Sequence, residues 1–214
     1  MAGEPNRQEL LTALTTEHFT LQGARSQTMS ESSSRATLYI GSVSSTLVAL
    51  GFLGQISEVG NLFNTFALTV LPTLYVLGLF TFVRLVECGA EDFRYGLAIN
   101  RIRHYYQQLA GDQAQLFLLS GHDDAEGVFA NAGVPLEGRT QYFTFATVVA
   151  VINSVVGGSA VALALGAFAD TSLAPAAVAG GAAAVISVAA LLRYAARLLA
   201  ARTGPVEALF PSPS

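Results

Sequence analysis

The chain has 214 residues, of which 52% are apolar and only 12% are charged. A soluble domain carries about twice that fraction of charged residues, so the composition argues against an ordinary soluble globule. The net charge of −4 argues against a nucleic-acid partner, because phosphate binding requires a basic surface, and the single cysteine excludes an internal disulfide and a CxxC motif.

The N-terminal segment, residues 1–35, is polar and has no continuous apolar run, so we expect no signal peptide. Apolar side chains and one histidine recur in it at a 3-4-3 spacing: Leu11, Leu14, His18 and Leu21. This spacing predicts an amphipathic helix, which lies either on the membrane surface or against the helix expected over residues 91–110. The small polar stretch SESSSR that follows is typical of a hinge.

Four stretches carry no charged side chain and are long enough to cross about 30 Å of hydrocarbon at about 1.5 Å per residue. They are residues 36–56, 62–83, 143–168 and 173–192. Four buried helices of a soluble bundle are the alternative, but soluble helices carry a charged stripe toward water, and these stretches have none. The sequence therefore predicts an all-α polytopic membrane protein with four transmembrane helices and cytoplasmic helical extensions.

All eleven basic residues are arginines, and all lie outside the four stretches. They are Arg7, Arg25, Arg35, Arg84, Arg94, Arg101, Arg103, Arg139, Arg193, Arg197 and Arg202. The two short connections within the hairpins contain none, so the positive-inside rule places both termini and the middle segment in the cytoplasm. Three tyrosines stand at the expected cytoplasmic ends of spans, where amphipathic rings are enriched: Tyr39, Tyr142 and Tyr194.

This orientation divides the chain into five parts. A cytoplasmic N-terminal helix with its hinge, 1–35, precedes a first transmembrane hairpin, 36–83. A cytoplasmic helical segment, 84–142, separates it from a second hairpin, 143–192, and a cytoplasmic tail, 193–214, follows.

Abundant alanine and the use of arginine in place of lysine are associated with GC-rich bacterial genomes, so we expect the bacterial inner membrane.

Small residues in the third and fourth spans recur four positions apart, which favours close helix contact in lipid. The residues expected in this contact are Gly158, Ala162, Gly166 and Gly180. Seven uncharged polar side chains also lie in the spans: Ser42, Ser45, Thr46, Asn64, Thr69, Thr73 and Asn153. They either make interhelical hydrogen bonds in a compact bundle or line an aqueous path in a homo-oligomer.

No ionisable side chain other than tyrosine lies within a span. Proton relays, voltage sensors and most ion-coupled transporters need such groups inside the membrane. An active transporter and a membrane-embedded acid–base enzyme are therefore disfavoured, whereas a passive pore and a membrane-anchored binding module remain open.

The middle segment contains a narrow apolar seam at a 4-3-4-3 spacing: Tyr95, Ile99, Ile102, Tyr106 and Leu109. It predicts a long helix, continuous with the second span, that packs on a partner helix. Beside the seam stands a basic set: Arg94, Arg101, Arg103 and His104. Two interpretations are open, because these side chains either bind an anionic ligand or lipid headgroup or only fix the topology at the membrane surface.

The stretch SGHDDAEGVF, residues 120–129, suggests a metal site or a helix cap. Metal binding needs further ligands, and the chain has only three histidines. We therefore expect Ser120 and Gly121 to end one helix, and Asp123 to cap the next with Glu126 completing a capping box. No metal or other cofactor is predicted, and the Pro/Ser-rich end of TGPVEALFPSPS is expected to be loose.

The segment SESSSRATLYIGSVSSTLVALGFLG, a polar helix entering a serine-rich span, resembles small four-span membrane proteins of high-GC, actinobacteria-like bacteria. It is also similar in layout to the Pycsar-type and SLATT-type membrane effectors of bacterial cyclic-nucleotide defence, over residues 25–110 at most. SLATT proteins have two spans where this chain has four, and no residue role is transferred. The resemblance implies a membrane effector gated from the cytoplasm.

These features predict a non-enzymatic, homo-oligomeric membrane protein that forms a channel or pore, gated or assembled through its cytoplasmic helices. A four-span bundle is too thin to enclose a water path, so a pore requires several copies. The alternative is a membrane-anchored module that presents residues 91–134 to a cytoplasmic protein partner. The bilayer is a partner in both cases, and no nucleophile–base pair or phosphate-binding loop points to an enzyme.

Overall fold

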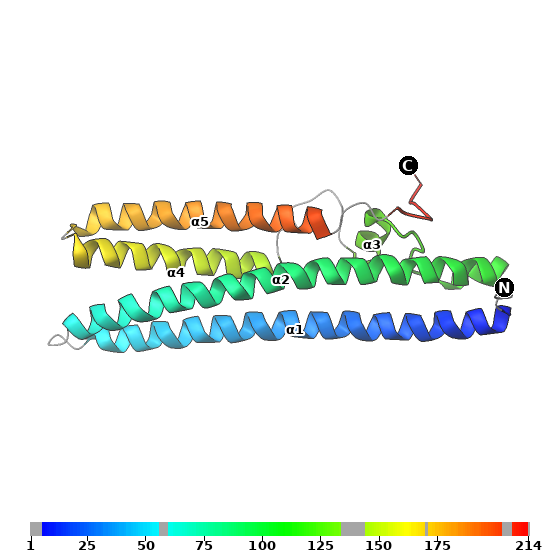
Figure 1. Ribbon diagram of the computed structural model, residues 1–214, viewed down its shortest axis with the longest axis horizontal. Helices are drawn as coiled ribbons and strands as arrows, with labels where there is room; N and C mark the ends of the chain where they lie inside the picture. The colour runs from blue at the N-terminus through cyan, green and yellow to red at the C-terminus, as the bar shows by residue number, and fades with distance from the viewer. Residues whose placement is uncertain (1–5, 56–59, 134–143, 170, 203–206, 214) are drawn as a thin grey trace, which may run out of the picture. The chain divides into compact units, whose positions relative to one another are not determined.

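The computed structural model of the protein describes residues 6–55, 60–133, 144–169, 171–202 and 207–213 (Figure 1). Within these ranges the regular structure is helical and contains no strand. Its helices are α1 (Arg7–Gln55), α2 (Gly60–Ala110), the 3-10 helix η1 (Gly111–Leu116), α3 (Ala125–Asn131), α4 (Phe145–Phe168) and α5 (Leu173–Arg202). Of the helices described, α1, α2, α4 and α5 are long and apolar enough to cross a membrane, which confirms the all-α prediction with four candidate spans. Arg139 and Tyr142 lie outside the described residues.

Helices α1 and α2 extend far beyond the apolar stretches that they contain. Helix α1 continues without a break through SESSSR, so the expected hinge is absent. Serine has only modest helix propensity, but Ser32 and Ala36 are buried, and packing of a helix face outweighs propensity. Helix α2 ends at Ala110, as expected for the helix over residues 91–110, and Gly111 after it adopts a positive φ of 54°. Ser120 and Gly121, which were expected to end a helix, lie in irregular structure after η1.

The chain divides into two compact units. Unit 1 comprises Met1–Glu31, Cys88–Tyr142 and Ala201–Ser214. In it the first part of α1 lies along the last part of α2, with the rings of His18 and Tyr106 edge to face at a centroid distance of 5.9 Å. The Tyr106 hydroxyl donates to Thr15 Oγ1 at 3.3 Å. Of the two placements considered for the N-terminal helix, the structure therefore has the one against α2.

The apolar seam of α2 is only partly covered in unit 1. Ile99 and Ile102 are buried, whereas Leu109 near the end of the helix is exposed. A salt bridge between Arg25 Nε and Asp92 Oδ1, at 2.7 Å, links the two helices beside this seam. The spacing of the seam therefore predicts which face of α2 is buried, but it does not predict that the burial stops before Leu109.

Unit 2 comprises Ser32–Glu87 and Phe143–Ala200 and contains the four apolar stretches. Its interior brings together residues of α1, α2 and α4: Ala36, Tyr39, Val43, Ala67, Leu71, Leu74, Phe82, Leu85, Val86, Val149, Ala150 and Val156. Large apolar side chains also cover its outside, including Leu38, Phe52, Phe80, Val155 and Ile186. Soluble monomers rarely expose so much contiguous apolar surface, whereas lipid-facing helices require it.

Candidate functional site

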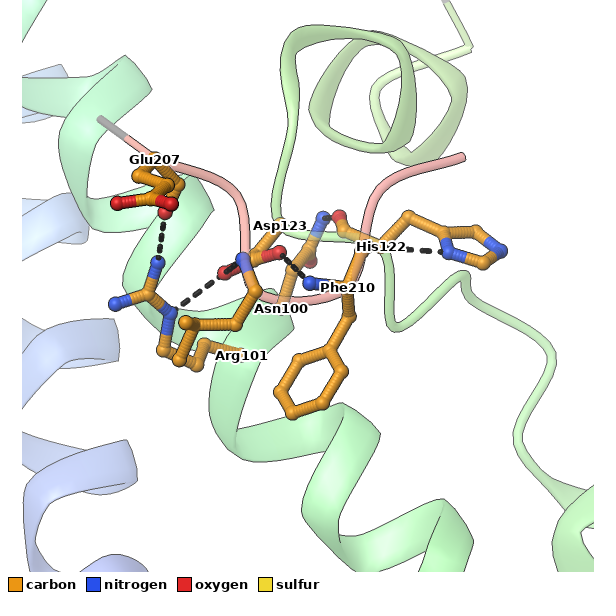
Figure 2. A network of polar contacts seen from close by, with 7 residues as sticks. Asn100, Arg101, His122, Asp123, Glu207 and Phe210 are labelled. Carbon is orange, nitrogen blue, oxygen red and sulfur yellow. Dashed lines mark hydrogen bonds and ion pairs between the residues drawn. The ribbon is translucent and has the colours of Figure 1, made fainter. Parts of the chain in front are cut away.

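The most elaborate polar site of unit 1 is built around Asp123 (Figure 2). The Asp123 side chain is 0% exposed. Its Oδ2 accepts a hydrogen bond from Arg101 Nε of α2 at 2.6 Å. Its carboxylate also accepts the backbone N–H groups of Leu209 at 3.2 Å and Phe210 at 2.7 Å. A buried carboxylate is stable only when it is paired and hydrogen-bonded, and Asp123 meets both conditions through partners distant in sequence.

Leu209 and Phe210, which donate to Asp123, belong to the C-terminal residues 207–213, and we call these seven residues the tail. The Glu207 carbonyl accepts a hydrogen bond from Arg101 Nη2 at 3.0 Å. The Phe210 carbonyl accepts from the backbone N–H of Asp123 at 3.2 Å and lies 3.3 Å from His122 Nδ1. The Ser212 backbone N–H donates to Asp124 Oδ2, and its hydroxyl donates to Asp124 Oδ1 at 2.9 Å. The tail expected to be loose is therefore held in place.

One ring contact adds side-chain selectivity to these main-chain contacts. The Phe210 ring stacks on the His104 imidazole with centroids 3.7 Å apart and planes 13° from parallel. We call the surface that holds the tail the tail dock. It consists of Arg101, His104, His122, Asp123 and Asp124.

The prolines of the tail lie at positions whose backbone nitrogen makes no hydrogen bond to the dock. The backbone N–H groups that donate belong to residues 209, 210 and 212, whereas residues 211 and 213 are proline and have no N–H. Each proline also restricts the residue before it to extended conformations, here Phe210 and Ser212. The unbound tail is thereby biased toward an extended form, which lowers the entropy lost on docking.

Two asparagines hold the loop that carries the acidic residues. Asn100 donates to the His122 carbonyl at 2.8 Å, and its Oδ1 accepts from Asn131 Nδ2 at 2.9 Å. Asn131, in turn, accepts the Ser120 N–H at 2.7 Å and donates to the Ser120 carbonyl at 2.9 Å. Between these anchors, a Cβ at Gly121 would lie 2.9 Å from His104 Cα, so the loop requires glycine there.

The contacts of the dock set the protonation states of its two carboxyls. Burial by itself would raise the pKa of Asp123, but the N–H of Phe210, the Arg101 guanidinium and the N–H of Leu209 hold this pKa below its ordinary value. The pKa of Asp124 is likewise lowered, because donors from Ser212 and Gly127 outweigh burial. Both groups are therefore anionic acceptors at neutral pH, and Asp123 is paired with the Arg101 cation.

The basic set expected to bind an anion is not gathered into one open site. Arg101 is committed to Asp123 and Glu207, and His104 to Phe210 and Gln108. Arg103 Nη1 donates to Asn100 Oδ1 at 2.7 Å and to the Ser120 carbonyl at 3.1 Å. Arg94 is exposed. The spacing places these residues on one stretch of α2, but it does not show that intrachain acceptors engage Nε and Nη2 of Arg101 and Nη1 of Arg103.

The predicted capping box of Asp123 and Glu126 is wrong: the N-cap is the next residue, and the residue three positions after it is Gly127, which has no side chain to complete a box. Asp124 caps α3 by accepting the Gly127 N–H at 2.8 Å, whereas Asp123 points to Arg101 and the tail. Aspartate is a favourable N-cap residue at either position, and the distant contacts of Asp123 leave Asp124 as the cap. The buried Asn100 is the residue whose role the sequence analysis missed, and an asparagine beside the apolar seam was the available signal.

The polar side chains of the spans do not converge. Ser45, Asn64, Thr69 and Thr73 are exposed, and Ser42 and Thr46 are half-buried. Four of these hydroxyls, on Ser42, Ser45, Thr69 and Thr73, donate to carbonyls four residues earlier in their own helices.

Asn153 behaves differently, because it is fully buried in unit 2. Its Oδ1 accepts the Tyr39 hydroxyl at 2.9 Å. Tyr39 is therefore not the membrane-surface ring that its position suggested, because the hydroxyl is drawn inward by the amide. A second polar contact, which the sequence analysis did not anticipate, runs from Ser154 Oγ to Ser187 Oγ at 3.0 Å.

The small residues bring α4 and α5 into close contact at one point. A Cβ on Gly158 would collide with the Gly180 carbonyl, and a Cβ on Gly180 would collide with the Gly158 carbonyl and lie 2.8 Å from Ala162 Cβ. Gly166, expected in the same contact, has open space at its Cβ position and takes no part. It lies near the end of α4, at Phe168.

Comparisons of the chain with protein-family models, with curated proteins and with solved structures find no match. Among the residues that the structure describes, no group of three His, Cys, Asp or Glu side chains is placed to hold a metal ion. The described helices, with their apolar outer surface, define an all-α, multi-pass membrane protein. Its most developed polar site is the one in unit 1 that contacts residues 207–213 of the same chain.

Proposed function

We propose that this protein is a membrane-anchored binding module whose unit 1 binds a short extended segment of a protein partner at the tail dock. The observation that carries the proposal is the seating of the tail by main-chain hydrogen bonds to Asp123 and Asp124. Such contacts recognise an extended peptide with little dependence on its side chains. The chain's own tail occupies the dock and competes with a partner segment.

The arginine distribution supports a cytoplasmic position for unit 1 in a bacterial inner membrane, because positively charged segments are retained on that side. The partner is then a cytoplasmic protein. The proposed role is binding, because the Asp123 carboxylate of the dock accepts hydrogen bonds from Arg101 and from the tail.

The proposal is tested with a fluorescent peptide of residues 207–214 and a detergent-solubilised chain that ends before residue 207. Anisotropy is expected to show saturable binding to this shortened chain. Asp123→Asn is expected to weaken binding roughly tenfold or more, since a hydrogen-bonded buried charge is lost. Glu126→Gln, an exposed acid in the first turn of α3, is the matched control and is expected to leave the affinity unchanged.

The full-length chain provides the competition arm of the same experiment. Its own tail is at a high effective concentration, so the peptide is expected to bind it more weakly than the shortened chain. Absence of saturable binding to the shortened chain, or equal loss with Glu126→Gln and Asp123→Asn, contradicts the dock.

A second candidate function is a homo-oligomeric channel. Polar side chains on the outside of unit 2, at Ser45, Asn64, Thr69 and Thr73, support it because an assembly could turn them toward a shared axis. The hydroxyls among them are already satisfied within their own helices, so lipid exposure is also compatible with them. Native mass spectrometry with flux from liposomes tests this candidate, and a monomer with tight liposomes removes it.

A further inference from the structure

A groove of about 620 Å³ lies in unit 1, and its described lining shares no residue with the tail or with the tail dock. Its lining comes from one face of α1, from α2, and from the segments on either side of α3: Gln22, Arg25, Ser26, Met29, Asp92, Ile99, Arg103, Leu119 and Ala132. Polar residues and apolar residues share this lining. The groove therefore offers both charged and apolar contacts to one ligand.

The lining carries an excess of positive charge. It contains two guanidinium groups and one carboxylate, a formal balance of +1 in a chain whose net charge is −4. The carboxylate of Asp92 is engaged with Arg25, whose Nε and Nη2 donate to its two oxygens at 2.7 and 3.1 Å. Arg103 uses Nη1 for Asn100 and Ser120. Its Nε and Nη2 make no hydrogen bond with the residues that the structure describes, so a fork of donors remains for a ligand.

The charge of Arg103 is poorly compensated where it stands. Burial and then the charge of Arg25 lower the pKa of this guanidinium from its ordinary value. Burial and then Arg103 lower the pKa of His18 as well. An anion in the groove would relieve this repulsion, and a guanidinium fork matches the oxygen spacing of carboxylates and phosphates.

The apolar part of the lining forms a path out of the groove. Ile99 is buried, whereas Met29 is 50% exposed and Leu119 is 42% exposed. The neighbouring Leu118 is 95% exposed. Large apolar side chains beside unsatisfied guanidinium donors fit a molecule with an anionic head and a hydrocarbon chain.

We propose that this groove binds an amphiphile with a single anionic headgroup, carboxylate or phosphate, at Arg103 and Arg25, with its hydrocarbon chain along Met29 and Leu119. The site is distinct from the tail dock, so the proposal does not depend on the proposed function. Either the bilayer or a soluble pool of acyl-chain anions could supply this chemistry.

The test uses the full-length protein in nanodiscs of phosphatidylcholine. Three probes are titrated by microscale thermophoresis: dihexanoyl phosphatidic acid, dihexanoyl phosphatidylcholine and inorganic phosphate. Saturable binding is expected for the phosphatidic acid, weaker binding for inorganic phosphate, and none for phosphatidylcholine. Arg103→Gln is expected to weaken phosphatidic acid binding roughly tenfold or more, because a charge-assisted pair is lost.

Two controls separate the groove from general electrostatics. Arg94→Gln removes the same charge from an exposed position on the same helix and is expected to leave the affinity within about twofold. Met29→Glu adds a negative charge to the exposed wall and is expected to weaken binding, whereas Gln27→Glu, on the same helix but outside the lining, is expected to have little effect. If Arg103→Gln fails to fold, the comparison of Met29→Glu with Gln27→Glu tests the site, and equal affinities of these two variants for phosphatidic acid contradict it.

Probe binding is then measured in a second set of nanodiscs, which contain phosphatidylglycerol, to distinguish a bilayer lipid from a soluble amphiphile. Loss of probe binding in these discs identifies a bilayer lipid as the occupant, and unchanged binding identifies a soluble amphiphile. The proposal is overturned if no probe saturates, if phosphatidylcholine binds as well as phosphatidic acid, or if Arg94→Gln weakens binding as much as Arg103→Gln.

Discussion

Arg101 and Asp123 form an ion pair in which the guanidinium Nε lies 2.6 Å from a carboxylate oxygen that is fully buried. The arginine side chain remains 38% exposed, so water reaches one partner and not the other. The pair joins α2 to the loop before α3, and both members also hold the tail. Removing either partner should therefore affect the stability of unit 1 and tail docking together.

Asp123→Asn is expected to lower the free energy of unfolding by about 2–3 kcal/mol, because the buried acceptor of three donors is replaced by a neutral amide. Thermal unfolding of the detergent-solubilised chain measures the loss. The tail is also expected to become accessible to carboxypeptidase. Glu126→Gln is the control, and a variant at Asp123 with wild-type stability and a protected tail would contradict the assignment.

Tail docking is expected to weaken at acidic pH. The pKa of Asp123 is lowered in the folded protein from its ordinary value of 3.8, and so is that of Asp124, so their stabilising contribution is complete well above pH 3.8. It falls as the pH drops below 3.8 and through the lower folded-state values. Anisotropy of the 207–214 peptide across this range measures the effect. The profile is expected to flatten with Asp123→Asn and to remain unchanged with Glu126→Gln.

Phe210→Ala in the peptide is expected to reduce affinity for the dock about tenfold, because the ring stacked on His104 is lost while the backbone N–H is kept. Leu209→Ala is the matched control, since Leu209 is exposed and contributes its N–H and not its side chain to Asp123. Equal losses for the two peptides would show that stacking contributes nothing.

Gly158→Val is expected to destabilise unit 2 by about 2 kcal/mol, because its side chain would collide with the Gly180 carbonyl and force α4 and α5 apart. Gly166→Ala provides the comparison, since its Cβ meets open space. Alanine has the higher helix propensity, so this control is expected to be neutral or stabilising. Unfolding in a mixed detergent titration compares the two, and a destabilised Gly166→Ala variant would contradict the proposed contact.

Gly78→Ala is expected to destabilise unit 2, because the new Cβ would overlap Asn153 Oδ1 and lie 2.8 Å from the Tyr39 hydroxyl. Adding Asn153→Ala is expected to recover part of the loss, because the overlapping amide is then absent. A double-mutant cycle measured by the same unfolding titration gives the coupling between the two positions. Additive effects would show that Gly78 does not hold the amide in place.

Much of the fold was predictable because the dominant signals are local. Uncharged stretches long enough to cross a bilayer identify α1, α2, α4 and α5, and the spacing of Ile99 and Ile102 identifies the buried face of α2. The continuity of α1 through Ser32 was not predictable, because weak local propensity there is outweighed by burial in the folded chain.

The site was less predictable because its contacts join distant parts of the sequence. Asp123 and Asp124 are both of a residue type that favours an N-cap, and the choice between them depends on Arg101 and on a tail almost ninety residues away. The prolines of the tail suggested disorder when read singly. Their meaning emerges only beside the acceptors, where Pro211 and Pro213 alternate with residues that donate N–H groups.

That alternation makes the seating of the tail largely indifferent to side-chain identity. Most tail groups that donate to Asp123 and Asp124 are backbone N–H groups, which every amino acid except proline supplies. The main side-chain contact is the Phe210 ring, which stacks on His104. An unrelated chain with an aromatic residue at the position of Phe210 and prolines at the positions of Pro211 and Pro213 could displace the tail without any wider sequence similarity. Searches based on overall sequence similarity would therefore miss segments that compete for the tail dock. The positions of their prolines would identify such segments.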